Sequence, residues 1–245
     1  MFEFNDESIA EFKSRIAVVR SEIGAACKEA GRDVNDVTLI GVSKVFPSTC
    51  AMSCYSAGLV NLGENKVQEL TAKEEELSNL GMHPNWHLIG TLQKNKVKYI
   101  IGKTKLVHSV DSVELAEEIS KRSAKAGIKT DVLFQVNVSR EESKHGFYDE
   151  EIKTSMDRLL SLEGINPRGL MTMAPLTSTS DEVRKIFADT YALYDDLKSF
   201  VNDKDSWNTL SMGMSRDYKE AIAEGSTHIR IGTAIFGDRK ALLDA

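Results

Sequence analysis

Residues 37–44 read Val37-Thr38-Leu39-Ile40-Gly41-Val42-Ser43-Lys44, an apolar run that is closed by a lysine. A continuous apolar run without polar alternation is typical of a parallel strand that helices cover. Seven further runs of this kind follow, at residues 59–63, 86–90, 106–110, 131–138, 168–174, 209–213 and 228–232. Eight such strands are the number that a closed (β/α)8 barrel needs.

Charged amphipathic stretches separate these runs, as expected for crossover helices. The alternation implies a parallel sheet, although an open doubly wound sheet alternates in the same way. Before the first run, residues 8–30 carry one apolar stripe at helical spacing, formed by Ile9, Phe12, Ile16, Val19 and Ile23. The 245 residues fit the roughly 250 of such a barrel. The pattern predicts an α/β fold: a single (β/α)8 TIM barrel with an extra N-terminal helix, spanning residues 1–245 as one domain.

The bulk composition argues against several classes of protein. A formal net charge of −6 argues against nucleic acid or an anionic membrane as the main partner. No run reaches the roughly 18 apolar residues of a membrane span, and the acidic N-terminus lacks a secretory signal pattern. The three cysteines do not make a disulfide framework. Pro84, between His83 and His87, argues against a metal site there. We therefore expect a cytoplasmic protein without a bound metal.

Lys44 is the first candidate for chemistry, because it would lie at the C-terminal mouth of the barrel. A buried ammonium is costly, and a desolvated lysine has a lowered pKa and becomes a nucleophile toward a carbonyl. A lysine whose amine reaches out to water at the rim explains the same pattern. Elsewhere, the charged run at residues 73–76, which begins with Lys73, is expected to be a solvated helix face.

Two turns with glycine or serine follow the last two predicted strands. Gly232 and Thr233 end the eighth strand, where barrels commonly hold a phosphate; Gly232 lets the backbone approach an anion. Ser215 ends the seventh strand, where it is placed both to cap the next helix and to bind a phosphate. A plain turn or a plain cap would explain either one alone. Both together, on consecutive strand ends, favour a phosphate site.

Segments along most of the chain match one known family. They lie at residues 42–44, 63–69, 87–96, 108–112, 142–146, 169–171, 211–215 and 230–233. Through these segments the sequence resembles the pyridoxal phosphate homeostasis protein family over residues 37–237. The resemblance implies a barrel of the alanine racemase N-terminal domain type, with pyridoxal 5′-phosphate (PLP) as its cofactor.

The resemblance also implies how the reactive end of the cofactor is held. Lys44 would carry PLP as a Schiff base, Arg230 would face the pyridine nitrogen, and Asn65 would lie beside the cofactor. One departure from the family pattern is Lys66, because an aromatic residue is expected after Asn65. This change would alter the mouth of the pocket and leave the role of Lys44 intact.

The phosphate end of the cofactor is assigned in the same way. Ser215, Gly232 and Thr233 would hold the phosphate, with Met214 contributing its backbone. His87 and Ser211 are expected in the pocket wall. No residue of the chain is expected to be catalytic.

The expected function follows from the family likeness. A guanidinium opposite the ring nitrogen disfavours protonation of that nitrogen, which weakens PLP as an electron sink. We also expect no second domain after Ala245, whereas racemases bring a second base on another domain. The expected protein is therefore a carrier and buffer in intracellular PLP homeostasis, without substantial enzymatic activity. Its expected partners are PLP and recipient apo-enzymes, and its expected state is a monomer.

Two other functions stay open. A minimal PLP-dependent amino-acid racemase would need an acid or base opposite Lys44, and Tyr55, Tyr99, Tyr148 and Tyr218 cannot be assigned there from the sequence. A third possibility is an interaction protein whose PLP state is read by a partner. Lys144, after the fifth strand, is expected to be a rim charge or a second PLP site.

Overall fold

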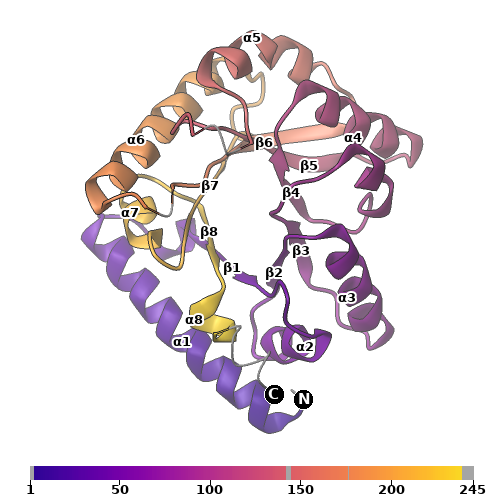
Figure 1. Cartoon of the computed structure of the whole chain (residues 1–245), viewed down its shortest axis with the longest axis vertical. Helices are drawn as coiled ribbons and strands as arrows, with labels where there is room; N and C mark the ends of the chain where they lie inside the picture. The colour runs from indigo at the N-terminus through magenta and orange to yellow at the C-terminus, as the bar shows by residue number, and fades with distance from the viewer. Residues whose placement is uncertain (1–2, 142–144, 176, 239–245) are drawn as a thin grey trace.

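The computed structural model describes residues 3–141, 145–175 and 177–238. Eight parallel strands close into a barrel in sequence order, and β1 pairs with β8 to complete it (Figure 1). Their bounds are β1 Thr38–Val42, β2 Asn61–Glu64, β3 Asn85–Leu88, β4 Leu106–Val110, β5 Thr130–Gln135, β6 Ile165–Met171, β7 Thr209–Met214 and β8 His228–Ile231. The predicted barrel is thus confirmed, and the open doubly wound sheet is excluded.

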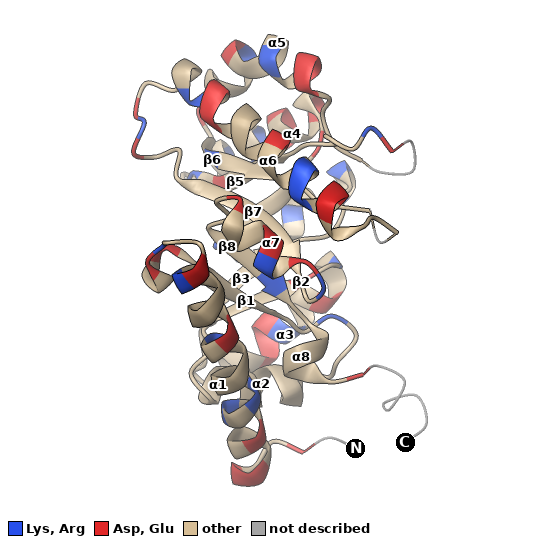
Figure 2. Ribbon diagram, turned by 90° about the vertical axis from the view of Figure 1, so that its left-hand side faces the viewer, with Lys and Arg blue, Asp and Glu red and all other residues tan. Residues whose placement is uncertain are grey.

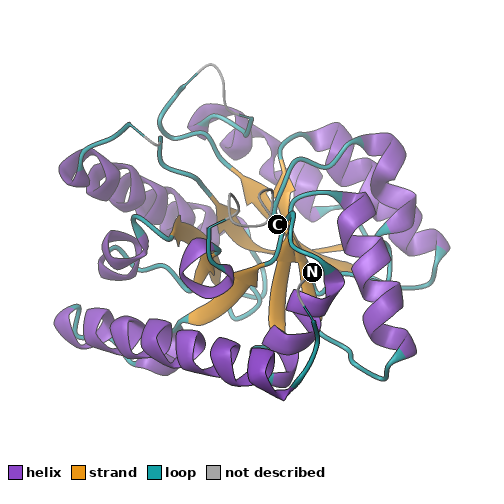
Figure 3. Ribbon diagram, turned by 60° about the horizontal axis from the view of Figure 1, so that its bottom comes forward, coloured by secondary structure: helices purple, strands orange, loops and turns teal. Residues whose placement is uncertain are grey.

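Helices surround the strands on the outside of the barrel (Figure 3). The α-helices are α1 Asp6–Glu29, α2 Ser48–Ser56, α3 Val67–Asn79, α4 Val113–Lys125, α5 Asp149–Leu160, α6 Ser180–Leu197, α7 Tyr218–Ala223 and α8 Thr233–Phe236. The 3-10 helices are η1 Val34–Asp36, η2 Lys94–Tyr99 and η3 Lys198–Phe200, and η2 stands between β3 and β4 in place of an α-helix.

The extra N-terminal helix is α1, which lies along α2, α7 and α8 (Figure 1). It begins at Asp6 after the cap residue Asn5, whose side chain accepts the Ser8 N–H in a capping box. The predicted apolar stripe is buried except for Ile9, which is half-buried; Phe12, for example, is 1% exposed and meets the ring of Phe236 edge-on at 5.3 Å. Because α8 is only one turn long, α1 supplies cover for the barrel where β8 returns to β1.

The main apolar core lies between the strands and the helices that cover them. A second, small cluster joins Leu106 of β4, Leu133 of β5 and Met171 of β6. Side chains alternate along a strand, so His108 shares a face with Leu106. The interior of the barrel is therefore shared between apolar and polar side chains.

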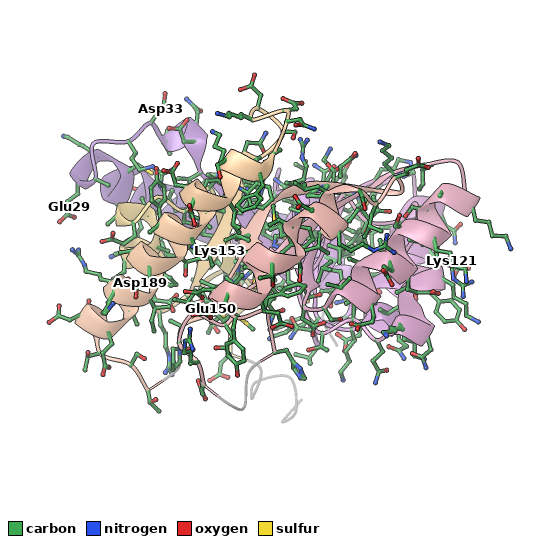
Figure 4. All side chains as sticks on the ribbon, turned by 90° about the horizontal axis from the view of Figure 1, so that it is seen from above. Glu29, Asp33, Lys121, Glu150, Lys153 and Asp189 are labelled. Atoms are coloured by element: carbon green, nitrogen blue, oxygen red, sulfur yellow. The ribbon has the colours of Figure 1, made fainter. Side chains whose placement is uncertain are left out.

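Charged side chains gather on the helices and loops, and the strands are mostly free of them (Figure 2). The charged residues labelled in Figure 4 belong to this outer layer. Within residues 3–141, 145–175 and 177–238, no helix combines the length and hydropathy that a membrane crossing requires.

Candidate functional site

The C-terminal ends of the strands surround a pocket of about 640 Å³, a size typical of small-molecule sites. All seven predicted site residues line it: Lys44, Asn65, Met214, Ser215, Arg230, Gly232 and Thr233. A wider groove of about 830 Å³ opens at the other end of the barrel, beside Thr38, Thr209 and His228. The structure thus brings the predicted residues together at the mouth where barrel chemistry is found.

Lys44 and Asn65 lie side by side because β1 and β2 run in parallel. Val42 pairs with Gly63, and each candidate residue follows two positions later. Lys44 is half-buried and lines the pocket, so it is not a lysine that merely points to water from the rim. An amine and an amide therefore share one side of the mouth.

Gly90 allows the loop after β3 to approach Asn65. A Cβ on Gly90 would lie 2.4 Å from the carbonyl oxygen of Asn65 and 2.8 Å from its Cα, which no side chain can tolerate. The carbonyl of Gly90 is fixed by the hydroxyl of Ser109, which donates to it at 2.6 Å. The glycine thus sets the position of a pocket residue from the neighbouring strand.

The residues predicted to bind a phosphate lie on the other flank of β1, at the ends of β7 and β8; β8 pairs directly with β1. The N–H of Gly232 points to the Ser215 hydroxyl oxygen at 3.4 Å, and the Thr233 side chain is exposed to the pocket. Arg216 also lines the pocket, although the sequence did not indicate it. A phosphate here would meet hydroxyl groups, a backbone N–H and a guanidinium.

One sequence-based expectation fails at the end of β7. Ser215 does not cap a helix, because α7 begins at Tyr218 and Asp217 occupies the cap position. The carboxylate of Asp217 accepts the N–H of Met214 at 2.5 Å and closes a turn. The contribution of the Met214 backbone to a phosphate site stays a prediction.

Arg230 forms the floor of the pocket. It is only 3% exposed, and its Nη2 donates to the carbonyl of Thr172 at 2.9 Å. Its Nη1 donates to the Ser211 hydroxyl at 2.5 Å. Burial lowers the pKa of Arg230 to about 10, against the opposing effect of the Asp217 carboxylate. The guanidinium therefore stays charged at neutral pH.

A chain of hydrogen bonds continues from Arg230 down the barrel interior. Ser211 Oγ lies 2.9 Å from His108 Nδ1, and His108 Nε2 lies 3.0 Å from His87 Nδ1. His87 Nε2 lies 3.4 Å from Asn61 Oδ1 at the start of β2. This polar column replaces some of the bulky apolar side chains that usually fill a barrel.

The direction of these hydrogen bonds follows from Arg230. A guanidinium only donates, so the hydroxyl of Ser211 accepts a hydrogen bond from it, and this hydroxyl can donate its own hydrogen to His108 Nδ1 when that nitrogen carries no proton. His108 must then carry its proton on Nε2 and donate to His87. Both imidazoles are neutral in this arrangement. Burial lowers the pKa of His87 to about 3 and that of His108 well below its ordinary value, which agrees with two neutral imidazoles.

Several expected residues lie elsewhere. His87 and Ser211 are not in the pocket wall; they lie below it and reach it through Arg230. Lys66 is exposed, and its Nζ lies 3.7 Å from Glu69 Oε1. None of the four tyrosines considered for the racemase lines the described part of the pocket, and Lys144 lies outside the described residues.

The run at residues 73–76 is not simply a solvated helix face. Lys73 is 4% exposed, and its Nζ lies 2.5 Å from Glu64 Oε1. The helical spacing in the sequence indicates the burial of Lys73, because Lys73 falls on the buried stripe of α3 with Val67, Leu70 and Leu77. The buried ion pair lies next to Lys44, because Lys73 also donates to the carbonyl of Ser43.

Comparison with known proteins supports the same fold. A family model for the alanine racemase N-terminal domain matches residues 37–240. A pyridoxal phosphate homeostasis protein of Aquifex aeolicus is 43% identical over 226 residues, which are 92% of this chain and 97% of that protein. An unknown protein from Bifidobacterium adolescentis superposes with a TM-score of 0.87 at 36% identity, covering 95% of this chain and 97% of the other. The PLP-bound structure of PipY from Synechococcus elongatus superposes with a TM-score of 0.80 at 34% identity, covering 92% and 100%.

Proposed function

The chain belongs to the pyridoxal phosphate homeostasis protein family, and we propose that it binds PLP through Lys44 as a carrier and buffer, not as an enzyme. The observation that carries the proposal is the convergence of all seven expected residues on one pocket at the barrel mouth. The relative PipY, whose solved structure holds PLP, supports the same assignment.

The pocket suits the three polar ends of PLP. The half-buried amine of Lys44 can reach an aldehyde. The hydroxyls of Ser215 and Thr233, with the N–H of Gly232, can hold a phosphate. The guanidinium of Arg230 can donate to a pyridine nitrogen. These groups lie on different strand ends, so one molecule would bridge the two sides of the mouth.

PLP, when bound, supplies an aldehyde for reversible imine chemistry and a ring that can withdraw electrons. The Lys44 amine would supply the nitrogen for such an imine, with the loss of one water, and the addition of one water would release the cofactor again, as a carrier requires. Arg230 stays charged and only donates, so it keeps the ring nitrogen unprotonated and the ring a poor electron sink. The site thus holds PLP without activating it strongly.

A second candidate is a minimal amino-acid racemase, favoured by one observation. Asp217 and Glu220 line the same pocket, and burial raises the pKa of Asp217. A carboxyl that keeps its proton closer to neutral pH is suited to general acid catalysis. Incubation of the loaded protein with L-alanine in deuterated water tests this, because racemisation would give the D-enantiomer and Asp217→Asn would abolish it.

Transfer of PLP tests the carrier function itself. Protein loaded with PLP and freed of excess ligand is mixed with an apo-aminotransferase, and recovery of aminotransferase activity is followed. We propose that this apo-enzyme regains activity, that the carrier works as a cytoplasmic monomer, and that it turns over no amino acid at an appreciable rate. Specific turnover of an amino acid that Lys44→Ala abolishes would contradict the proposal.

A further inference from the structure

The turn that carries Lys44 has an unusual backbone. Val45, the next residue, has a φ of 65°, in the left-handed region. This conformation is uncommon for any residue except glycine, and for a β-branched residue it is an outlier. Such strain persists only where the surrounding structure holds it in place. The contacts around the turn therefore indicate what holds Lys44.

Three contacts from β2 and α3 hold the turn. The N–H of Val45 donates to Glu69 Oε2 at 2.8 Å. The carbonyl of Ser43 accepts from Lys73 Nζ at 2.8 Å, and the hydroxyl of Ser43 donates to Glu64 Oε1 at 2.6 Å. The residues on both sides of Lys44 are thus fixed by charged groups, which make stronger hydrogen bonds than neutral ones.

Burial of the ion pair between Lys73 and Glu64 carries a cost in free energy. Their side chains are 5% and 0% exposed, and the second carboxylate oxygen of Glu64 is buried without a hydrogen-bond partner among the residues that the structure describes. Burial raises the pKa of Glu64 against the opposing effect of Lys73. A buried ion pair often contributes no more stability than apolar residues of the same size. A role in fixing the local geometry accounts for its presence better than stability does.

We propose that Lys73, Glu64 and Glu69 are positioning residues, which hold the strained turn at Val45 and so set the direction in which the Lys44 amine enters the pocket. We call these three residues the brace. The inference rests on the proposed attachment of PLP to Lys44. It adds that α3, which begins just after Asn65, controls how fast that attachment forms.

The first test uses the protein without ligand. Hydrogen exchange at the Val45 amide is measured in the wild type, in Glu69→Ala and in Glu76→Ala, an exposed control on the same helix. Loss of a hydrogen bond to a carboxylate should speed exchange at Val45 at least about tenfold in Glu69→Ala. Equal exchange rates in the wild type and Glu69→Ala would overturn the inference, whatever the protein binds.

The second test measures the rate constant for covalent attachment of PLP. Glu69→Ala and the double variant Lys73→Met with Glu64→Gln, which removes both buried charges together, should slow attachment about 10- to 100-fold. In a Lys44→Ala background the same substitutions should change PLP affinity less than about twofold, because the brace bonds the backbone of Ser43 and Val45, whereas the residues proposed to bind the phosphate lie at the ends of β7 and β8. If the brace substitutions weaken PLP affinity as much in the Lys44→Ala background as in protein that keeps Lys44, the brace acts on the whole pocket. That result would contradict a positioning role.

Glycine at position 45 provides a rescue. Val45→Gly adopts a φ of 65° without strain, so the turn should depend less on the brace. Attachment in Val45→Gly with Glu69→Ala should therefore be faster than in Glu69→Ala alone. If Val45→Gly does not speed attachment in the Glu69→Ala variant, the role of strain is contradicted. A wild type that attaches no PLP at all would instead contradict the proposed function, while the exchange result would still stand.

Discussion

The two sides of the pocket mouth are held in different ways. On the phosphate side, formed by Ser215, Gly232 and Thr233, the support is local in sequence: the carboxylate of Asp217 accepts the N–H of Met214, three residues earlier, at 2.5 Å. On the lysine side, formed by Lys44 and Asn65, the turn is fixed by the brace, whose charged groups come from β2 and α3.

This difference matches two separate requirements: binding of a phosphate, and placement of the Lys44 amine for covalent attachment. A phosphate is held by several donors at once, so a small error in any one of them is tolerated. A single amine must meet one carbon atom, and a misplacement of about 1 Å can cost about 100-fold in rate. The brace, whose buried ion pair is the more costly support, therefore holds the group whose position matters most, the Lys44 amine. Three changes break or sharpen this comparison, beginning with the largest expected effect.

Acid should weaken the polar column below Arg230. The folded-state pKa of His87 is about 3 and that of His108 is also lowered, against 6.5 in the unfolded chain. Below about pH 6.5 the unfolded state binds more protons, so stability falls as the pH drops toward 3. Between pH 7 and pH 5 we expect each of these histidines to reduce the free energy of unfolding by about 2 kcal/mol.

Urea unfolding as a function of pH measures this loss. His145→Asn is a suitable control, because His145 is 67% exposed in its side chain. The control should keep the full pH dependence, and His87→Gln should reduce it. A free energy of unfolding that is flat between pH 7 and pH 5 would show that the two imidazoles are not buried in neutral form.

Gly90→Ala should damage the lysine side. Its Cβ would lie 2.4 Å from the carbonyl oxygen of Asn65, so the loop or Asn65 must move. We expect a loss of about 1–3 kcal/mol in the free energy of unfolding. Gly24→Ala is the matched control, because Gly24 lies within α1 and no neighbouring atom in the described part of the chain lies within 4 Å of the added methyl group; this change should raise the free energy of unfolding by roughly 0.5–1 kcal/mol. Equal effects of the two changes would refute the close approach of Gly90.

Ser215→Ala should affect only the phosphate side. Removal of one hydroxyl should weaken PLP binding by about 0.5–1.5 kcal/mol, roughly a factor of 2 to 12. The rate of covalent attachment at saturating PLP should stay unchanged, because Lys44 and its brace are untouched. Equilibrium titration and stopped-flow measurements separate the two quantities. A slower attachment at saturation would show that the two sides of the mouth are coupled.

The two sides also differ in how well the sequence predicts them. The eight apolar runs predicted every strand, because a covered parallel strand has a continuous apolar pattern. The glycine and serine turns after β7 and β8 have local signatures, and the residues that they marked line the pocket, although their binding of a phosphate stays a prediction. The expected cap at Ser215 was wrong, because α7 begins only at Tyr218 and the Asp217 carboxylate accepts the N–H of Met214 in a turn before the helix, which the spacing of the residues did not indicate.

The brace could not be predicted in the same way. Lys73 and Ser43 are 30 positions apart, and their contact depends on how α3 packs on β1 and β2. The adjacent glutamates made residues 73–76 resemble a solvated face, although Lys73 lies on the buried stripe of α3. The left-handed turn at Val45 carries no glycine to mark it. Tertiary contacts of this kind override local pattern.

Covalent attachment at Lys44 is the central claim, and visible absorption tests it most directly. The purified protein is mixed with PLP, and its spectrum is recorded before and after borohydride reduction, beside that of Lys44→Ala. We predict a yellow band in the wild type that reduction converts to a stable adduct on Lys44, and no such band in the variant. A wild type that stays colourless with added PLP, or a variant with the same band, would contradict the account.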